Sequence, residues 1–282
     1  MRAKNLFGIL FLFLCTIGFV SCAKEEWDLG GKETESSTVV EGTIISTDGM
    51  PLADIVVKVD YQENKWLQYS KTIHKAETKT DKNGKYRLHF MIKDNEMETD
   101  GDKKNDISKS YSLIFDLKRL NQKEYILPGD MVPTIISVNP PIAKPTDNLQ
   151  PEIRYGYYQF KRSETYTENL YIPEKRYIRV TLKGFVPLQQ DGNYDYFEVD
   201  SAFPYGGEYT SDILFPGTNY GYGKIEELFV LYAEGEQTFE VPVALNENNI
   251  IKLVRRKNGS FTTEEHQLFV TKDSPESLSY QY

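Results

Sequence analysis

The chain has 282 residues, 27% of them charged, and carries a formal net charge of −9 at pH 7. This length is enough for one large domain or for two of about 100 to 150 residues each, and we predict two. Because the phosphates of nucleic acids attract Lys and Arg, the acidic balance argues against a nucleic-acid partner.

The first 22 residues have the pattern of an export signal. A start with two basic residues leads into an apolar run over residues 6–20, which is followed by Ser21 and Cys22. A basic start, an apolar core and a small residue before the cleavage point are typical of a secretory signal peptide. The last four of these residues, Phe-Val-Ser-Cys, resemble a bacterial lipobox, although Phe19 stands where Leu is more usual. The resemblance implies that Cys22 carries a diacylglycerol thioether.

The predicted signal peptide covers residues 1–21, and its removal would leave Cys22 as the first residue. Since the chain has two cysteines and the other, Cys15, lies in the signal, no disulfide is expected, and the exported chain must fold by core burial. An uncleaved membrane helix is the alternative, but the apolar run is shorter than the roughly 20 residues that a bilayer crossing needs. Two or three acyl chains hold a protein to a membrane permanently. We therefore expect outer-membrane lipid as the partner of Cys22.

Residues 22–38 form a polar, charged tract with few apolar side chains, which predicts a flexible tether. Lys24-Glu25-Glu26 resembles the short Lys-acid-acid signal that sends Bacteroidetes lipoproteins to the outer face of the outer membrane. The resemblance implies a location facing the cell exterior, and the periplasmic face is the alternative.

Residues 39–150 are predicted to form a first β domain, because apolar and polar residues alternate between turns marked by glycine or proline. Asp48-Gly49 and Asn83-Gly84 supply the positive φ that tight hairpins require, and Asn83-Gly84 is the strongest hairpin signal in the chain. The predicted strands cover residues 40–46, 53–61, 76–80, 85–90 and 111–117.

This first segment resembles the carboxypeptidase regulatory-like domain, a small prealbumin-like or transthyretin-like sandwich. The resemblance covers about residues 39 to 90 and rests on a glycine in the first strand, a Gly-x-Pro-Leu turn and a Thr-Asp-x-x-Gly-x-Tyr hairpin. The matching residues are Gly42, Gly49, Pro51, Leu52, Thr80, Asp81, Gly84 and Tyr86. The family is non-catalytic in itself, so the resemblance implies a β-sandwich rather than a function.

Residues 94–106 are rich in carboxylates and predict a solvated insertion loop. Calcium is the alternative, because that ion requires several oxygens on a flexible turn. Alignment with a helix-loop-helix calcium site places the apolar Ile107 where a bidentate Glu belongs. His74, His89 and His266 show no zinc-site spacing, so neither a metal nor another cofactor is predicted.

Residues 151–175 are left open between a linker and an excursion of the first domain. Residues 176–273 read as short strands separated by turns, which predicts a second, immunoglobulin-like sandwich, and residues 274–282 form a tail. The predicted strands of the second domain cover residues 177–185, 196–199, 225–232, 237–243, 249–254 and 266–270. The predicted fold class is therefore all-β, with a prealbumin-like sandwich followed by an immunoglobulin-like one.

The candidate ligand-binding residues are tyrosines of an aromatic, glycine-rich stretch in the second domain, whose rings could stack on sugars or on a protein partner. Packing of the sandwich ends is the alternative. These residues are Tyr194, Tyr196, Tyr205, Tyr209, Tyr220 and Tyr222. Asp200-Ser201-Ala202 resembles the tripeptide at which Bacteroidetes O-glycosylate exported proteins, which implies a glycan on Ser201.

No catalytic pattern stands out. No Gly-x-Ser-x-Gly elbow occurs, and the side chains of Glu226 and Glu227 would point to opposite faces of a strand. We therefore predict a non-enzymatic, lipid-anchored binding or scaffold protein with a glycan or a surface protein as its ligand.

The main alternative is a fimbrial subunit that assembles by strand exchange, since fimbrillins of this phylum are lipoproteins with two prealbumin-like domains. The tail over residues 274–282 could supply the exchanged strand. A hydrolase is the third alternative, and it would require a pocket with perturbed carboxylates.

Overall fold

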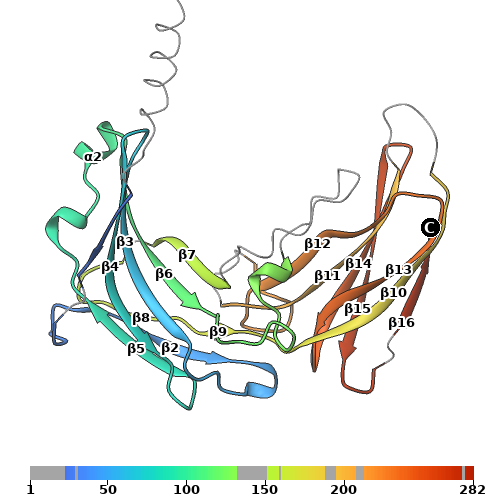
Figure 1. The fold of residues 1–282 in the computed structure, drawn as a ribbon, viewed down its shortest axis with the longest axis horizontal. Helices are drawn as coiled ribbons and strands as arrows, with labels where there is room; N and C mark the ends of the chain where they lie inside the picture. The colour runs from blue at the N-terminus through green and yellow to red at the C-terminus, as the bar shows by residue number, and fades with distance from the viewer. Residues whose placement is uncertain are drawn as a thin grey trace, which may run out of the picture.

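The computed structural model of the chain describes residues 23–28, 31–131, 151–158, 160–187, 195–207, 213–274 and 277–282. Two β-sandwiches lie side by side, with the N-terminal half on the left of Figure 1 and the C-terminal half on the right. The predicted fold class is confirmed: the chain is all-β and forms two successive β-sandwiches.

The first sandwich consists of two sheets. The larger sheet has five strands in the order β1-β4-β3-β6-β7, which are Ala23–Trp27, Tyr69–Lys79, Val56–Lys65, Ile107–Asp116 and Glu152–Tyr158. The smaller sheet has the order β5-β2-β8, which are Lys85–Phe90, Thr38–Ile45 and Thr165–Thr167, and β9, Leu170–Tyr171, also pairs with β2. The segment over 151–175 thus adds strands to both sheets of the first sandwich.

The second sandwich also consists of two sheets. One has three strands in the order β13-β10-β16, which are Gly235–Ala244, Lys175–Phe185 and Ser277–Gln281. The other has four strands in the order β12-β11-β14-β15, which are Tyr222–Leu231, Tyr196–Pro204, Glu247–Lys257 and Ser260–Val270. Period-two alternation in the sequence thus located six of these seven strands, with most ends shifted by a few residues, whereas β16 lies in the predicted tail.

The two predicted hairpins of the first domain are wrong as hairpins, although their turns form. Asp48 and Gly49 do have positive φ, at 58° and 73°, and so does Gly84, at 72°. However, β2 and β5 belong to one sheet while β3 and β4 belong to the other. Each turn therefore carries the chain from one sheet to the other, because the strands on either side bury their apolar faces against opposite sides of the same core.

Two glycines of the family resemblance lie where the backbone packs too closely for a side chain. A Cβ on Gly42 would overlap the carbonyl oxygen of Glu168, which precedes β9. A Cβ on Gly84 would overlap the carbonyl oxygen of Ile44 in the neighbouring strand. Glycine at these positions allows β2 to be covered on both edges, by β5 on one side and by β8 and β9 on the other.

The two sandwiches share apolar packing at their junction. The core of the first sandwich includes Phe203, Tyr205 and Ile225 from the second, all of them buried. Backbone hydrogen bonds join Tyr171 and Gly206 across the junction in both directions, at 3.0 and 2.7 Å. The halves are therefore held together by a continuous core rather than joined by a bare linker.

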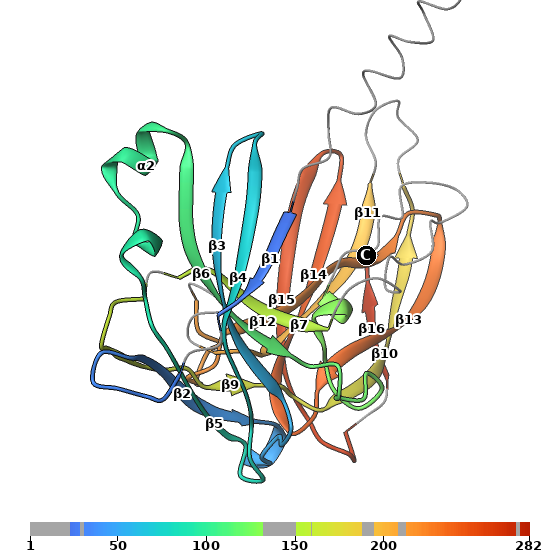
Figure 2. The same cartoon turned by 60° about the vertical axis from the view of Figure 1, so that its left-hand side comes forward.

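The N-terminal segment differs from the predicted tether, because it packs along the first sandwich. Residues 23–27 form β1, which pairs in parallel with β4 from Ala23↔Ser70 to Trp27↔His74, and Figure 2 shows the two strands side by side. The Trp27 and His74 rings lie 4.3 Å apart. A free edge of β4 would leave backbone groups unpaired, and pairing with β1 satisfies them.

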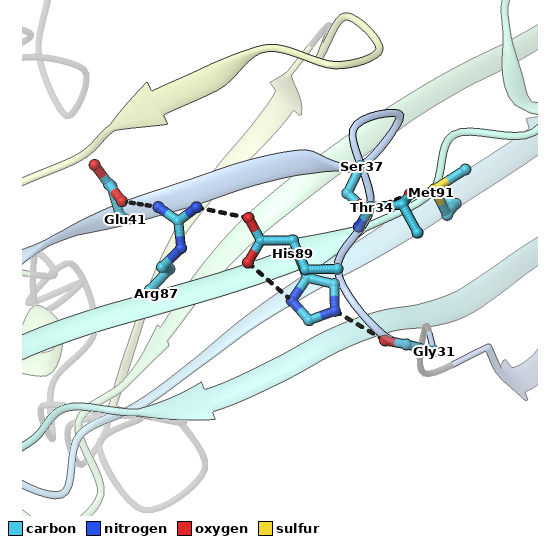
Figure 3. A network of polar contacts seen from close by, with 8 residues as sticks. Gly31, Thr34, Ser37, Glu41, Arg87, His89 and Met91 are labelled. Carbon is cyan, nitrogen blue, oxygen red and sulfur yellow. Dashed lines mark hydrogen bonds and ion pairs between the residues drawn. The ribbon is translucent and has the colours of Figure 1, made fainter.

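A polar network holds residues 31–37 against β5 (Figure 3). Arg87 contacts the carboxylates of Glu33, at 2.7 Å, and Glu41. His89 Nε2 donates to the Gly31 carbonyl oxygen at 2.9 Å. These contacts are exposed, so each contributes little on its own, but together they fix where the segment runs.

The acidic insertion is only partly the solvated loop that the sequence predicts, because one of its carboxylates is buried. Lys75 on β4 is 1% exposed, and its Nζ lies 2.7 Å from both Glu96 Oε1 and Asp28 Oδ2. Glu96 is 4% exposed, and its Oε2 accepts a hydrogen bond from the Tyr111 hydroxyl at 2.9 Å. Lys75 thus links the segment that follows β1 to the insertion.

Helices are few and short. The four-residue helix η3, Pro128–Met131, and the five-residue helix α2, Asp100–Lys104, are the longest that the described residues contain. In α2 the Thr99 side chain accepts from the Asp102 N–H as an N-cap. Within the described residues, no helix has the length and apolar character needed to cross a membrane.

We predict that Lys75→Met destabilises the first sandwich by about 3–5 kcal/mol, because it leaves the buried Glu96 carboxylate without its counter-charge. Lys75→Met with Glu96→Gln should recover much of this loss, because no uncompensated charge is then buried. Urea unfolding of the three chains tests this. A double variant no more stable than Lys75→Met would show that the ion pair is not the cause.

Candidate functional site

The tail after Asp273 forms a strand at the edge of the second sandwich. β16 pairs in parallel with β10, from Arg179↔Ser277 to Lys183↔Gln281. It is the last strand of its sheet, since β10 separates it from β13. Its departure would therefore expose a row of unpaired backbone groups on β10.

Alternate side chains of this tail complete the second core. Leu278, Tyr280 and Tyr282 are partly buried and pack against the core residues of the second sandwich. The Tyr282 ring meets the Phe185 ring edge-on at 4.8 Å, and its hydroxyl donates to the Arg256 carbonyl oxygen at 2.8 Å. Because alternate strand residues point to one face, the tail closes the gap between the two sheets.

The receiving surface is shaped for this tail. The Arg255 guanidinium on the opposite sheet donates two hydrogen bonds to the Gln281 carbonyl oxygen, at 3.1 and 2.8 Å. Gly184 on β10 has a positive φ of 68°, and a Cβ there would overlap the Gln281 side chain. β10 is irregular at this point, where its register with β13 shifts between Leu182 and Phe185.

The candidate tyrosines do not gather into one site. Tyr205 is buried in the junction core, and Tyr220 stacks on Tyr171 with ring centroids 4.2 Å apart. Tyr222 packs on Phe215. Tyr222 pairs with Pro204 at one end of β11, whereas Tyr196 lies at the other end, about 26 Å away at roughly 3.3 Å per residue. Tyr194 and Tyr209 lie outside the described residues.

Of the candidate tyrosines that the structure describes, Tyr196 alone belongs to an exposed aromatic cluster. Its ring lies 6.1 Å from that of Tyr232 and 6.2 Å from that of Phe261. Tyr232 and Phe261 are 53% and 59% exposed, and the Arg256 guanidinium lies 5.5 Å from the Phe261 ring centroid. These side chains come from neighbouring strands on the outer face of the four-stranded sheet.

Next to this cluster lies a pair of buried carboxylates. Glu198 and Asp200 on β11 are 5% and 4% exposed. The N–H of Glu227 donates to Glu198 Oε1 at 2.9 Å and to Asp200 Oδ1 at 3.3 Å. Glu227 has a positive φ of 59°, so the irregularity of β12 aims its N–H at the pair. Lys252 Nζ lies 3.5 Å from Asp200 Oδ2.

Burial raises the pKa of Glu198 to about 8, and the hydrogen bond and negative charge of Asp200 act in the same direction. Protonated Glu198 can therefore donate to Asp200, so that the pair shares a proton near neutral pH. The sequence-based search for a carboxylate pair missed these residues because it considered adjacent glutamates. The Glu-x-Asp spacing in the sequence could have indicated the pair, since residues two apart in a strand have their side chains on one face.

Of the two predicted modification sites, the structure describes Ser201 but not Cys22. Ser201 is 1% exposed and its hydroxyl donates to the Pro242 carbonyl oxygen at 2.9 Å. The sandwich as it is folded therefore leaves no room for a glycan on this hydroxyl. Cys22 lies outside the described residues, immediately before β1.

Two adjoining polar grooves lie along β2, of about 340 and 510 Å³, and both are lined by Thr43, Thr167 and Asn169. Tyr220 borders the smaller one. Glu198 and Asp200 line neither. In the part of the chain that the structure describes, no three His, Cys, Asp or Glu side chains come together as a metal site would require.

No protein-family model matches the chain, and no curated protein matches it. Among solved structures, the shaft pilin SpaA from Lactobacillus rhamnosus GG is 10% identical with a TM-score of 0.28, over 87% of this chain and 98% of the pilin. The Bacillus anthracis TIE protein is 12% identical with a TM-score of 0.23, over 88% of this chain.

The 3-chlorocatechol 1,2-dioxygenase from Rhodococcus opacus 1CP is 16% identical with a TM-score of 0.19, over 38% of this chain. The matches span 50% of the dioxygenase and 34% of the TIE protein. All these TM-scores are low, so the likenesses carry no functional argument.

We predict that the carboxylate pair makes the fold less stable as pH rises from about 4.5 to about 8. In this window folded Glu198 keeps its proton while the unfolded chain has lost it. The free energy of unfolding then falls by up to about 1.4 kcal/mol per pH unit. Glu198→Gln should remove this contribution, and denaturant unfolding across the window measures it. Parallel pH profiles of the two chains would contradict the shared proton.

Proposed function

We propose that the protein is a lipid-anchored subunit of a cell-surface assembly, in which β16 of one copy takes the place of β16 in another. The observation that carries this proposal is the structure of the tail. It is a five-residue edge strand, with Leu278, Tyr280 and Tyr282 packed into the second core. Strand addition at a sheet edge is a recurring mode of protein association.

Exchange loses no contacts, because the contacts in an exchanged pair are the same as those within one copy. The donated strand would meet the same β10 edge, the same Arg255 and the same apolar gap. A copy that donates its tail leaves its own β10 open to the tail of a third. Such head-to-tail contacts extend into filaments when they do not close into a ring.

The proposed anchor is acylated Cys22, which would hold the N-terminal sandwich at the outer face of the outer membrane. β1 belongs to the first sandwich and β16 to the far side of the second (Figure 1). In this proposal the segment before β1 anchors the protein to the membrane, and β16 joins one copy to the next.

A glycan-binding role is the second candidate, and one observation favours it. Tyr232 and Phe261 are exposed beside Tyr196, and aromatic rings on a sheet face can stack on sugar rings. Retention on a glycan array that Tyr232→Ser with Phe261→Ser abolishes would support this role.

We propose a non-enzymatic role for the chain as a whole. A hydrolase would have to use Glu198 and Asp200 as acid and base. Substrate turnover that Asp200→Asn abolishes would overturn the non-enzymatic proposal.

We predict that a disulfide between β10 and β16 blocks assembly. Thr181 and Ser279 are register partners in the parallel pair, so Thr181→Cys with Ser279→Cys places two thiols within bonding reach. The full chain, held near its unfolding midpoint at high concentration, should form dimers and longer ladders in native mass spectrometry. The oxidised variant should stay monomeric, and reduction should restore its ladders.

Ser279→Cys alone, with Cys22 acylated or replaced by Ser, is the matched control and should assemble like the original chain. Ladders that persist in the oxidised variant would show that copies associate without releasing β16. An original chain that stays monomeric under all these conditions would contradict strand exchange.

A further inference from the structure

The tip of the β3–β4 hairpin exposes two large apolar side chains. Trp66 is 76% exposed and Leu67 is 86% exposed, and they follow each other in the turn between the strands. Trp27, on the neighbouring strand β1, is also exposed, at 65%. Single exposed apolar side chains are common, but two large ones together at the tip of a hairpin are typical of a contact surface.

The backbone of this tip adds a second observation. Leu67 has a positive φ of 57°, a conformation that is unfavourable for leucine and that glycine or asparagine adopts more easily. The turn is held in this shape, since the Gln68 N–H donates to the Lys65 carbonyl oxygen at 3.0 Å and the Trp66 N–H donates to that of Asp106 at 3.4 Å. The chain thus holds a leucine outward in a conformation that does not suit it.

The strands below the tip are well supported, so the pair is presented by a rigid element. The Tyr69 hydroxyl donates to Glu63 at 2.6 Å, and the Ser70 hydroxyl donates to Asn64 at 2.6 Å, both across the hairpin. β3 also pairs with β6 along its whole length, from Val56↔Asp116 to Lys65↔Ile107.

The position of the tip relative to the chain start identifies what it faces. β1 runs parallel to β4, and its first residue, Ala23, is the register partner of Ser70, which is close to the tip. The Cα of Cys22 is one peptide away, within about 3.8 Å of that of Ala23. Acyl chains on this cysteine would therefore enter the bilayer beside Trp66 and Leu67.

We propose that the Trp66–Leu67 tip inserts into the interfacial region of the phospholipid bilayer beside the acylated Cys22, as a second anchor that orients the first sandwich. This inference rests on the lipid anchor of the proposed function. Tryptophan favours the level of the lipid headgroups, and an apolar tip strengthens attachment beyond that of the acyl chains. The ion pair between Asp28 and Lys75 holds β1 beside β4, and β4 is one of the two strands that carry the tip.

The chain has two tryptophans, which makes the test direct. Trp27→Phe leaves Trp66 as the only tryptophan, and Trp66→Phe leaves Trp27 as the matched control. Each lipidated full chain is reconstituted into phosphatidylcholine vesicles with either ordinary or brominated acyl chains. Emission of Trp66 should shift to the blue and fall about twofold or more in brominated lipid, while that of Trp27, at the far end of β1, should change little.

Leu67→Asn, made in the Trp27→Phe chain, separates membrane contact from a structural role. Asparagine suits a positive φ better than leucine does, so the unfolding midpoint should stay the same or rise. Quenching of Trp66 by brominated lipid should nevertheless weaken, because the apolar tip is lost. A lowered midpoint with unchanged quenching would overturn the proposal.

The outcomes also separate the tip from the anchor. Vesicle flotation with no quenching of Trp66 overturns the tip insertion and leaves the lipid anchor intact. A blue shift without quenching indicates that the tip packs on a second copy, which also overturns the proposal. A chain that does not float with the vesicles overturns both the tip and the anchor.

Discussion

The fold depends on how the edges of its β-sheets are covered, because an unpaired edge presents a row of backbone donors and acceptors to any other strand. In the first sandwich the edge of β4 is covered by β1, and in the second the edge of β10 is covered by β16. Both covering strands have five residues, pair in parallel and lie at the ends of the described chain. Because each pairs in parallel with its neighbour, neither strand belongs to a hairpin.

The sequence predicted local geometry well but predicted strand partners poorly. Asn258-Gly259 and Asn83-Gly84 have the same chemistry, yet the first closes a two-residue hairpin between β14 and β15 and the second carries the chain to the other sheet. A turn sets φ over a few residues, whereas the partner of a strand depends on which face of the core its apolar residues fill. That choice involves residues far apart in the chain, and no local pattern contains it.

The sequence located the tail as a candidate exchanged strand but did not locate the carboxylate pair. The alternation of Leu278, Tyr280 and Tyr282 is visible in the sequence, but it does not show that the tail pairs with β10 of its own copy. Glu198 and Asp200 show the spacing of one strand face, yet their burial depends on the surroundings of β11 and on an N–H supplied by the irregular Glu227. The spacing can be read from the local sequence. The burial that raises the pKa of Glu198 depends on residues far away in the chain.

Buried carboxylates occur in both sandwiches, and each is compensated in its own way. Glu96 is neutralised by the ammonium of Lys75, which is a charged partner that holds the N-terminal segment in place. Glu198 instead retains a proton, since burial and Asp200 disfavour its charged form. The first arrangement makes the position of the N-terminal segment depend on an ion pair, whereas the second makes the stability of the other sandwich sensitive to pH.

Competition within each copy limits how readily β16 is exchanged. A strand tied to its own sheet has an effective concentration in the millimolar range, so a dilute chain keeps its own tail. The proposed anchoring in a membrane would change this balance, because neighbouring copies would be confined to two dimensions. The shared core at the junction, which includes Phe203 and Ile225, fixes the second sandwich relative to the first. Copies oriented alike by their anchors would then have their β10 edges at one height above the membrane. At that height the tail of a neighbour can compete with a copy's own tail for its β10 edge.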